Sequence, residues 1–160
     1  MWELLRRFRA LEPKARAVFL RAAVLLPLIS VSLRLRGFRA TQSSLQKRLP
    51  GAASKPANQS SGPRDEWAAL TALTARMVKA AAHRTWGSPQ CLEQSLALWW
   101  LLGRQGISSS VRIGTRKTGE KFEAHAWVEC DGAALNEPEE PHEHYAAFEE
   151  AFPVLGGAKK

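Results

Sequence analysis

The sequence is poor in cysteine and has no long uncharged apolar run. Its 160 residues include two cysteines, Cys91 and Cys130, which is too few for the disulfide framework of a small secreted domain. The longest uncharged apolar run covers residues 22–33, whereas a membrane-spanning helix needs about 20 such residues. A small-x-small triplet at 30–32 resembles a signal-peptide cleavage site, but a long charged start precedes it and arginines follow it at once. We therefore expect a cytoplasmic protein rather than an exported one.

Acidic residues are scarce at the front of the chain. Residues 1–50 hold 11 Lys and Arg but only 2 Asp and Glu, whereas residues 121–160 hold 3 and 9. The net charge of +8 therefore combines a basic front with an acidic end. Nucleic acid is not an expected partner, because the arginines are not interleaved with stacking aromatic residues on a sheet and no nucleic-acid motif is present.

Helical spacing of apolar residues marks two basic helices at the front. The first is predicted over residues 2–11. The second begins at Pro13, is kinked at Pro27 and ends at Gly37. We favour a helical hairpin that packs on the rest of the protein, because basic helices usually keep one face in solvent. The alternative is a docking surface over residues 1–39 for an acidic partner or for the surface of a membrane.

A segment rich in Pro, Gly, Ser and Ala divides the sequence. Residues 50–63 carry one charge and no large apolar side chain, so they cannot bury a core and are predicted to form a flexible linker. The linker separates an N-terminal basic helical segment, residues 1–49, from the main domain, residues 64–160. A short helix is predicted at the end of the first segment, within residues 38–49.

The main domain changes from a helical to a strand period. Apolar spacing predicts a helix that opens at Asp65 and another that is capped by Ser88, which places Cys91 in its first turn. From residue 108 onward the period is two, which predicts strands over residues 108–114 and 122–129.

The last part of the chain completes the predicted sheet. An Asp131-Gly132 turn leads to a return strand over residues 133–137, and a short helix is expected over residues 145–151. Helices followed by an antiparallel sheet are the pattern of the α+β class.

Three residues suggest nucleophilic catalysis. A cysteine in the first turn of a helix lies near free backbone amides, which favour the thiolate and can bind a developing oxyanion. His125 is the side chain suited to take and return the proton of Cys91 near neutral pH. The histidine then needs an acceptor that fixes its tautomer, and Glu137 is the preferred candidate. By spacing alone, a buried structural cysteine and a packed histidine are the more common interpretation.

The choice of the third residue depends on the hairpin register. A two-residue loop, Asp131-Gly132, would pair Cys130 with Ala133 and leave Asn136 on the face of His125. A three-residue loop, which includes Cys130 and closes on Gly132, would instead place His125 directly opposite Glu137. We prefer the three-residue loop and keep Asn136 as the alternative.

Several short motifs resemble one known family. They are Cys91–Leu96 (CLEQSL), Leu101–Ile107 (LLGRQGI), Arg112–Gly114 (RIG) and His125–Glu129 (HAWVE). In these motifs the chain is similar to the microcin-processing, transglutaminase-like family, whose members are the leader peptidases of lasso-peptide biosynthesis, the protease part of the maturation B protein. The similarity is close over about residues 65–137.

The resemblance implies both a fold and a triad. The fold is a papain-like transglutaminase core, in which a helix that bears the cysteine packs on an antiparallel sheet, here with an N-terminal helical appendage. The family's cysteine falls on Cys91, its histidine on His125, and its acidic residue, usually Asp, on Glu137. Glutamate is one methylene longer than the usual Asp and can still accept the imidazole N–H.

The resemblance also implies the reaction and its partners. Such a peptidase removes the leader from a ribosomally made precursor peptide, and an ATP-dependent, asparagine-synthetase-like cyclase then closes the ring. The leader is usually held by a small recognition domain. Residues 1–50 are predicted as helices rather than the strands of that domain, so a separate recognition protein is an expected partner. The reaction needs no cofactor.

Further residues are candidates for the walls of the site. Gln90 and Trp86, just before Cys91, are candidates to line an oxyanion pocket, although capping and packing explain them equally well. Trp127 is expected to cover or pack against the imidazole of the histidine two residues before it. The run His142–His144 resembles a pair of metal ligands, but its acidic surroundings favour a solvated loop, so no metal is expected.

Three functions compete at this point. The first is the leader peptidase, and the second is a related acyl-transfer enzyme, a transglutaminase or amidase, which shares the acyl-enzyme intermediate and differs only in the acceptor. The third is a binding module without catalytic activity, whose basic helices dock on an acidic partner or a membrane surface.

Overall fold

The computed structural model describes most of the chain. The described residues are 2–50, 64–85, 87, 89–118, 121–136 and 145–147.

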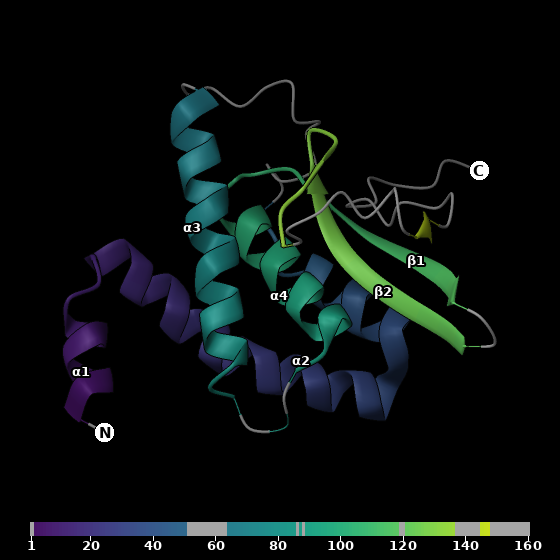
Figure 1. Ribbon diagram of the computed structural model, residues 1–160, viewed down its shortest axis with the longest axis horizontal. Coiled ribbons are helices and arrows are strands. Elements are labelled where there is room, and N and C mark those ends of the chain that lie inside the picture. The colour runs from purple at the N-terminus through teal and green to yellow at the C-terminus, as the bar shows by residue number, and fades with distance from the viewer. Residues whose placement is uncertain are drawn as a thin grey trace.

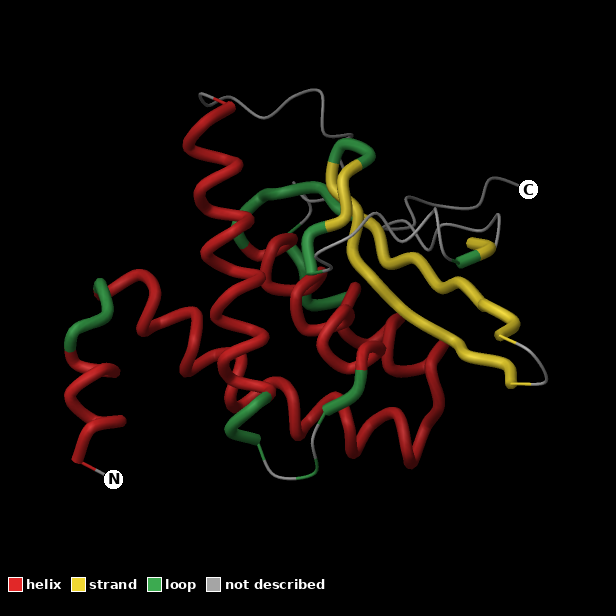
Figure 2. The backbone as a smooth tube through the Cα atoms, in the orientation of Figure 1, coloured by secondary structure: helices red, strands yellow, loops and turns green. Residues whose placement is uncertain are grey.

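Among the described residues, four helices precede a small antiparallel sheet, which confirms the predicted α+β class (Figure 1). The helices are α1 Trp2–Arg9, α2 Pro13–Gln46, α3 Arg64–Ala82 and α4 Cys91–Arg104. The strands are β1 Ser110–Thr118, β2 Lys121–Cys130, β3 Ala133–Ala134 and β4 Ala146–Ala147. Their order across the sheet is β3-β2-β1-β4, and the long hairpin of β1 and β2 projects to one side of the helices (Figure 2).

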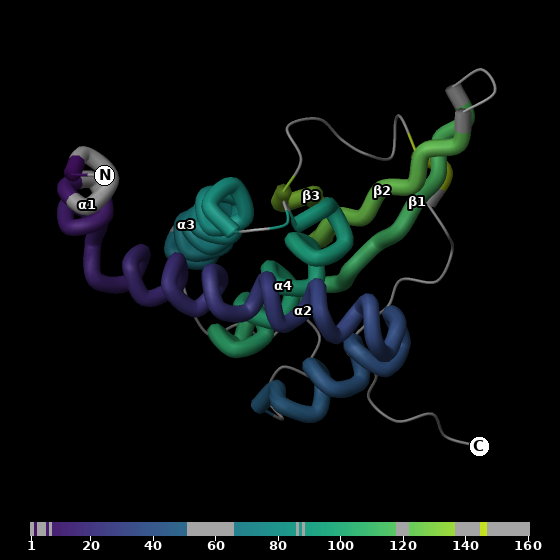
Figure 3. The backbone as a smooth tube through the Cα atoms, turned by 90° about the horizontal axis from the view of Figure 1, so that it is seen from below, coloured from purple at the N-terminus to yellow at the C-terminus, as the bar shows by residue number. Residues whose placement is uncertain are grey.

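Helix α2 consists of two helical parts joined at Gly37. This glycine adopts φ 74° and ψ 178°, which lies in the left-handed half of the map that glycine enters without steric cost. The carbonyl oxygen of Gly37 accepts a 2.8 Å hydrogen bond from Thr41 Oγ1, and Ser32 Oγ lies 2.8 Å from the same hydroxyl. The chain reverses its direction there (Figure 3). The predicted helix end at Gly37 and the short helix after it are both confirmed.

One side of α2 forms part of the hydrophobic core. Ala22, Leu26 and Ile29 are at most 1% exposed and belong to the same buried cluster as the apolar residues of α3 and α4. The second part of α2 is tied to α4 by a 3.0 Å hydrogen bond from Trp100 Nε1 to the carbonyl oxygen of Leu45. Packing of the N-terminal helices on the rest of the protein, the interpretation we favoured, is thus observed for α2. The linker over residues 50–63 and the domain boundaries on either side of it stay predictions, because residues 51–63 lie outside the described part.

Helix α4 begins later than the sequence predicts. Its N-cap is Gln90 rather than Ser88, so Cys91 is the first helical residue. The side chain of Glu93 accepts the backbone N–H of Gln90 at 3.0 Å, as in a capping box. This local hydrogen bond, three residues apart, replaces the serine cap that we expected.

The far end of α4 closes with a glycine in the left-handed conformation. Gly106 has φ 79°, and the N–H groups of Gly106 and Ile107 return to the carbonyl oxygens of Gly103 and Leu102. This is the Schellman arrangement. Ile107, whose side chain is buried, then begins the short connection from α4 to β1.

The hairpin between β2 and β3 has the shorter of the two loops considered. Cys130 pairs with Ala133, so the loop is Asp131-Gly132, and our preference for a three-residue loop is wrong. Both loop residues have positive φ, 51° and 83°, as a type I′ turn requires, and aspartate tolerates this conformation better than most residues do. The argument that placed Glu137 directly opposite His125 therefore no longer holds.

The predicted helix over residues 145–151 is also wrong in its described part. Ala146 and Ala147 form strand β4, which pairs with Thr115 and Gly114 of β1. The pairing partner is about thirty residues away in the sequence, and a local apolar pattern carries no information about such a contact. Residues 148–151 lie outside the described part.

Candidate active site

Cys91 occupies the first helical position of α4. Its side chain is half-buried and forms no disulfide. The first backbone N–H groups of a helix lack partners within the helix and carry a partial positive charge. The sequence therefore places the Cys91 thiol in the first turn of a helix, beside the first backbone amides, as predicted.

A polar junction joins α4 to the strand that carries His125. Ser95, one helical turn after Cys91, donates a buried 2.9 Å hydrogen bond to the carbonyl oxygen of Ala126. Asn136 bridges the same two elements, because its Oδ1 accepts the N–H of Val128 at 2.8 Å and its Nδ2 lies 3.4 Å from Ser95 Oγ. These bonds fix the start of α4 against the middle of β2.

The two faces of the β1–β2 hairpin have different surroundings. The helix face carries Val111 and Val128, which are fully buried in the core shared with α4. Because side chains alternate along a strand, His125, Trp127 and Glu129 stand on the opposite side. We call that side the outer face.

Aromatic rings surround His125 on the outer face. The ring of Tyr145 lies 5.1 Å from the imidazole, and the ring of Trp127 lies 6.3 Å from it at an interplanar angle of 19°. His125 pairs across the ladder with Gly114. A Cβ at Gly114 would come within 2.9 Å of the Trp127 ring and 3.1 Å of the carbonyl oxygen of Ala146. Glycine at this position therefore leaves the space that the indole ring fills.

Hydrogen bonds hold Trp127 in this position. Its indole N–H donates to Glu129 Oε1 at 3.0 Å, and Arg112 Nε donates to Glu129 Oε2 at 2.8 Å. The indole is completely buried, and Glu129 is 8% exposed. A buried carboxylate is costly unless it is paired and hydrogen-bonded, and here both of its oxygens are bonded.

A second ion pair on the outer face is more exposed. Arg116 Nη2 donates to Glu123 Oε2 at 2.6 Å, and the side chains are 39% and 48% exposed. The guanidinium also lies over the ring of Tyr145, with 4.9 Å between Cζ and the ring centroid. The hydrogen bond to Glu123 raises the pKa of Arg116 above its usual range. The Arg116 guanidinium and the His125 imidazole therefore both lie beside the ring of Tyr145.

The described contacts do not bring Cys91 and His125 together. The histidine lies on the outer face of the sheet, whereas α4 packs on the helix face. Ala126, which accepts the bond from Ser95, follows His125 directly, and Ser95 is about 6 Å beyond Cys91 along the helix axis. In the described part of the chain, no hydrogen bond joins the Cys91 thiol to the His125 ring. Catalytic hydrogen bonds often tighten only when substrate is bound. The Cys91–His125 pair stays a prediction.

The other predicted site residues are divided between described and undescribed positions. Gln90 caps α4 next to Cys91, and Trp127 packs beside the imidazole. That either of them lines a pocket stays a prediction. Asn136 contacts Val128 and Ser95. Glu137 and Trp86 lie outside the described residues, and their roles stay predictions.

Sequence reasoning missed several residues of the site. Ser95 lies four residues after Cys91, on the same side of the helix, and Glu129 follows His125 at an even spacing that puts both on one strand face. Those two signals could have been used. Tyr145 reaches His125 through the long-range pairing of β4, for which the sequence has no local signal.

An open cavity of about 340 Å³ lies between α3 and α4, beside the junction. Asn136 and Gln94 contribute its amide groups, and Arg76 and Lys79 of α3 contribute positive charge. The cavity thus offers hydrogen-bonding groups one helical turn from Cys91.

No group of three or more His, Cys, Asp or Glu side chains that could hold a metal ion occurs among the described residues. The run His142–His144 lies outside them.

A helix that begins at a cysteine and packs on an antiparallel sheet with a histidine strand defines a class of cysteine-based acyl-transfer proteins. The model of the transglutaminase-like superfamily matches residues 22–150, and the chain belongs to that superfamily. The superfamily generally includes cysteine peptidases and transferases. The match begins within α2, so it includes part of the N-terminal helix as well as the α4–sheet unit. No curated protein and no solved structure matched the chain.

Proposed function

We propose that the chain is a cysteine peptidase that removes the leader from a ribosomally made lasso-peptide precursor. The observation that carries the proposal is the placement of Cys91 as the first residue of α4 in a chain of the transglutaminase-like superfamily. The motifs around Cys91 and His125 resemble those of lasso-peptide leader peptidases. This resemblance favours one substrate, the peptide bond between leader and core, over other acyl groups.

In the proposed reaction, Cys91 and His125 divide the chemistry. His125 takes the thiol proton, and the Cys91 thiolate attacks the scissile carbonyl carbon to form a tetrahedral oxyanion near the free amides of α4. The C–N bond then breaks, and the protonated imidazole gives its proton to the leaving amine, which is the amino end of the core peptide. Water, deprotonated by His125, attacks the thioester, and the thiol and the leader carboxylate are released.

The surroundings of His125 support its proposed role. The rings of Tyr145 and Trp127 restrict the rotation of the imidazole, and Glu129 fixes the indole in turn. Under the proposal, Glu137 accepts the second imidazole N–H, and Asn136 is the alternative acceptor. Gln90, Trp86 and Trp127 would line the pocket.

The proposal includes partners. A separate leader-recognition protein would deliver the precursor, and an ATP-dependent, asparagine-synthetase-like cyclase would consume the freed amino end. The open cavity between α3 and α4 provides amide groups and positive charge beside the junction, where a peptide segment could bind.

Replacement of each of the two cysteines tests the proposal. Cys91→Ala should lower precursor cleavage by about 10⁴-fold or more, since the nucleophile is lost, whereas Cys130→Ala should cleave normally. Cleavage is measured by mass spectrometry of the cognate precursor with the recognition protein present, and circular dichroism checks that both variants fold. Unimpaired cleavage by Cys91→Ala would overturn the proposal.

The same assay separates hydrolysis from acyl transfer. Superfamily membership also fits a transferase, which would pass the acyl group from Cys91 to an amine instead of water. With a primary amine such as glycine methyl ester added, a peptidase still releases the free leader carboxylate. A leader carrying the mass of the amine as the main product would identify a transferase.

Iodoacetamide separates both enzymes from a binding module. A catalytic Cys91 should be alkylated near neutral pH faster than Cys130, whose thiol pKa is raised by burial and by the adjacent Asp131. Equal and slow alkylation of both thiols would favour a non-catalytic protein.

A further inference from the structure

The side of α2 that faces away from the core carries a continuous row of large apolar side chains. We call this row the α2 stripe. Its members are spaced by three or four residues and are each more than half exposed: Leu20 52%, Val24 63%, Leu28 62%, Val31 54% and Leu35 79%. This spacing places them on one face of a helix. The stripe extends about 22 Å at the helical rise per residue.

Buried residues occupy the opposite side of the same helix. Val18, Ala22, Leu26 and Ile29 follow the same three- and four-residue spacing and are at most 7% exposed. Helix α2 is therefore apolar on two sides, of which α3 and α4 cover only one. Soluble proteins rarely leave a contiguous apolar face of this kind exposed without a function for it.

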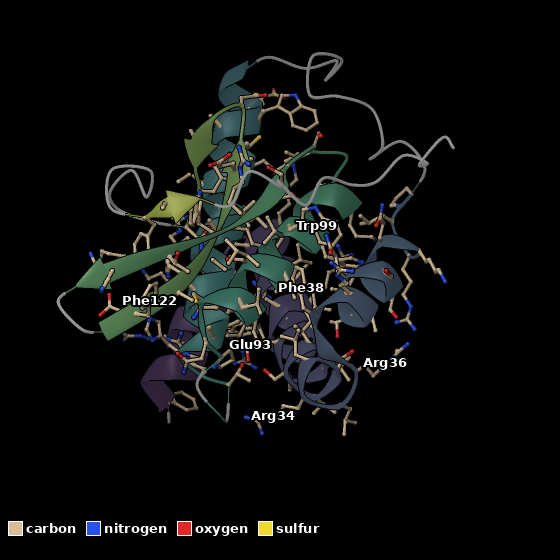
Figure 4. The ribbon with its side chains drawn as sticks, turned by 90° about the vertical axis from the view of Figure 1, so that its right-hand side faces the viewer. Arg34, Arg36, Phe38, Glu93, Trp99 and Phe122 are labelled. Carbon is tan, nitrogen blue, oxygen red and sulfur yellow. The ribbon has the colours of Figure 1, made fainter. Side chains whose placement is uncertain are left out.

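Positive charge brackets the α2 stripe. Arg21 lies at one end, and Arg34, Arg36 and Arg39 lie at the other, all of them exposed. Helix α2 contains no Asp or Glu, and the ion pairs described in the structure involve other arginines. Arg34 and Arg36 lie at the margin of the molecule, away from the buried Trp99 (Figure 4).

Helix α2 is long and apolar enough to cross a membrane, by length and composition alone. Only 22% of its most apolar 18 residues are buried. A spanning orientation would however separate Ala22, Leu26 and Ile29 from α3 and α4, because the three are completely buried against them. The fold is compatible with a helix that lies on a membrane and keeps its core face on the protein.

We propose that the α2 stripe binds the surface of an anionic lipid bilayer. The apolar side chains would enter the boundary between headgroups and acyl chains, as the apolar face of an interfacial helix does. The bracketing arginines would bind lipid phosphates, for which the guanidinium is suited by geometry and permanent charge. The charge pattern favours this occupant over a second copy of the chain, since two copies facing each other would bring like charges together.

Vesicle co-sedimentation tests the proposal with the full chain. The protein should sediment with phosphatidylcholine vesicles that contain 30 mol% phosphatidylglycerol and bind pure phosphatidylcholine much more weakly. The double variant Val24→Asp/Leu28→Asp should lose binding. Phe122→Asp is the matched control, because Phe122 is 73% exposed but lies on the hairpin outside the stripe, and it should bind like the wild type.

Arginine variants and salt test the electrostatic part. Arg34→Gln/Arg36→Gln should weaken partitioning to anionic vesicles by about fivefold per residue, as expected for basic side chains near such a surface. Binding should also fall as salt is raised. Absence of binding to anionic vesicles, equal binding to neutral vesicles, or an equal loss in Phe122→Asp would each overturn the proposal.

Light scattering measures the oligomeric state of the same proteins and so tests for self-association through the α2 stripe. A wild-type dimer that becomes a monomer in Val24→Asp/Leu28→Asp, without vesicle binding by the wild type, would assign the stripe to a contact between copies and overturn the membrane proposal.

Discussion

The two faces of the β1–β2 hairpin are both buried in part, but by different means. On the helix face, Val111 and Val128 join a large core that three helices share. On the outer face, Trp127 is just as completely buried but is not part of that core. Its described neighbours include the rings of His125 and Tyr145, the carboxylate of Glu129 and the backbone of Gly114.

The difference shows which face of the hairpin depends on the identity of each side chain and which depends mainly on side-chain volume. Apolar side chains on the helix face can be exchanged for others of similar volume with modest cost. On the outer face the contacts are specific, from the hydrogen bond of the indole N–H to Glu129 to the packing of the Arg116 guanidinium over Tyr145. The outer face also carries the predicted catalytic histidine, so its order matters for position as well as for stability.

The largest expected effect concerns Trp127, whose ring is completely buried on the outer face. Trp127→Ala should lower the free energy of unfolding by about 3–5 kcal/mol, because it removes a completely buried indole and leaves a cavity. Urea denaturation measures the loss. Phe122→Ala, in which an exposed ring on the same strand is removed, should change stability little. If Trp127→Ala cost less than Val128→Ala on the helix face, the outer face would not be a second packed region.

A smaller effect should separate the two ion pairs of the outer face. Glu129→Gln removes the carboxylate that pairs with Arg112. The amide that replaces it has one oxygen to accept from the two donors, Arg112 Nε and Trp127 Nε1, and turns its NH₂ group toward the other. The free energy of unfolding should therefore fall by about 1–3 kcal/mol. Glu123→Gln breaks the exposed pair with Arg116 and should have little measurable effect. Thermal unfolding at low and high salt compares the variants. Equal losses would show that burial does not distinguish the two pairs.

The smallest effect depends on pH. Burial raises the pKa of the Cys130 thiol, and Asp131 adds to the rise. The folded protein therefore retains this proton at pH values where the unfolded chain has lost it, so stability should be full below about pH 8.5, the ordinary thiol pKa, and fall as pH rises further.

Cys130→Ser gives the control for this dependence. A serine hydroxyl does not titrate there and can still donate to the carbonyl oxygen of Ser108, as the thiol does at 3.4 Å. Urea midpoints between pH 7 and 10 should fall less in this variant than in the wild type. An identical pH dependence would assign it to other groups.

Local signals predicted much of the fold. The left-handed residue at Gly37, the return of the chain at Asp131-Gly132 and the alternation across His125 and Trp127 each depend on residues close in sequence. A helix with Cys91 in its first turn was also expected, although it begins later than predicted, with Gln90 as its cap. Each of these features is determined by residues a few positions apart, so it can be predicted from the local sequence.

Other features depend on contacts between distant parts of the chain. The register of β3 was predicted incorrectly, because Gly132 fits the closing position of a three-residue loop as well as the second position of a type I′ turn. Strand β4 and the position of Tyr145 follow from pairing with Gly114 and Thr115, and Ser95 acquires its role only through Ala126. The encounter of α4 with β2 was thus expected, but the bonds that fix it were not.

The hydrogen bond from Trp100 to Leu45 spans 55 residues of sequence. During synthesis, α2 leaves the ribosome well before α4, and at about 5–20 residues per second the partner follows about 3–11 s later. Early in that interval the core face of α2 lacks both α3 and α4, and it stays only partly covered until α4 emerges, so the nascent chain presents apolar side chains on two sides. Because of this order of synthesis, the chain should be most prone to aggregate, or to bind a chaperone, before α4 emerges.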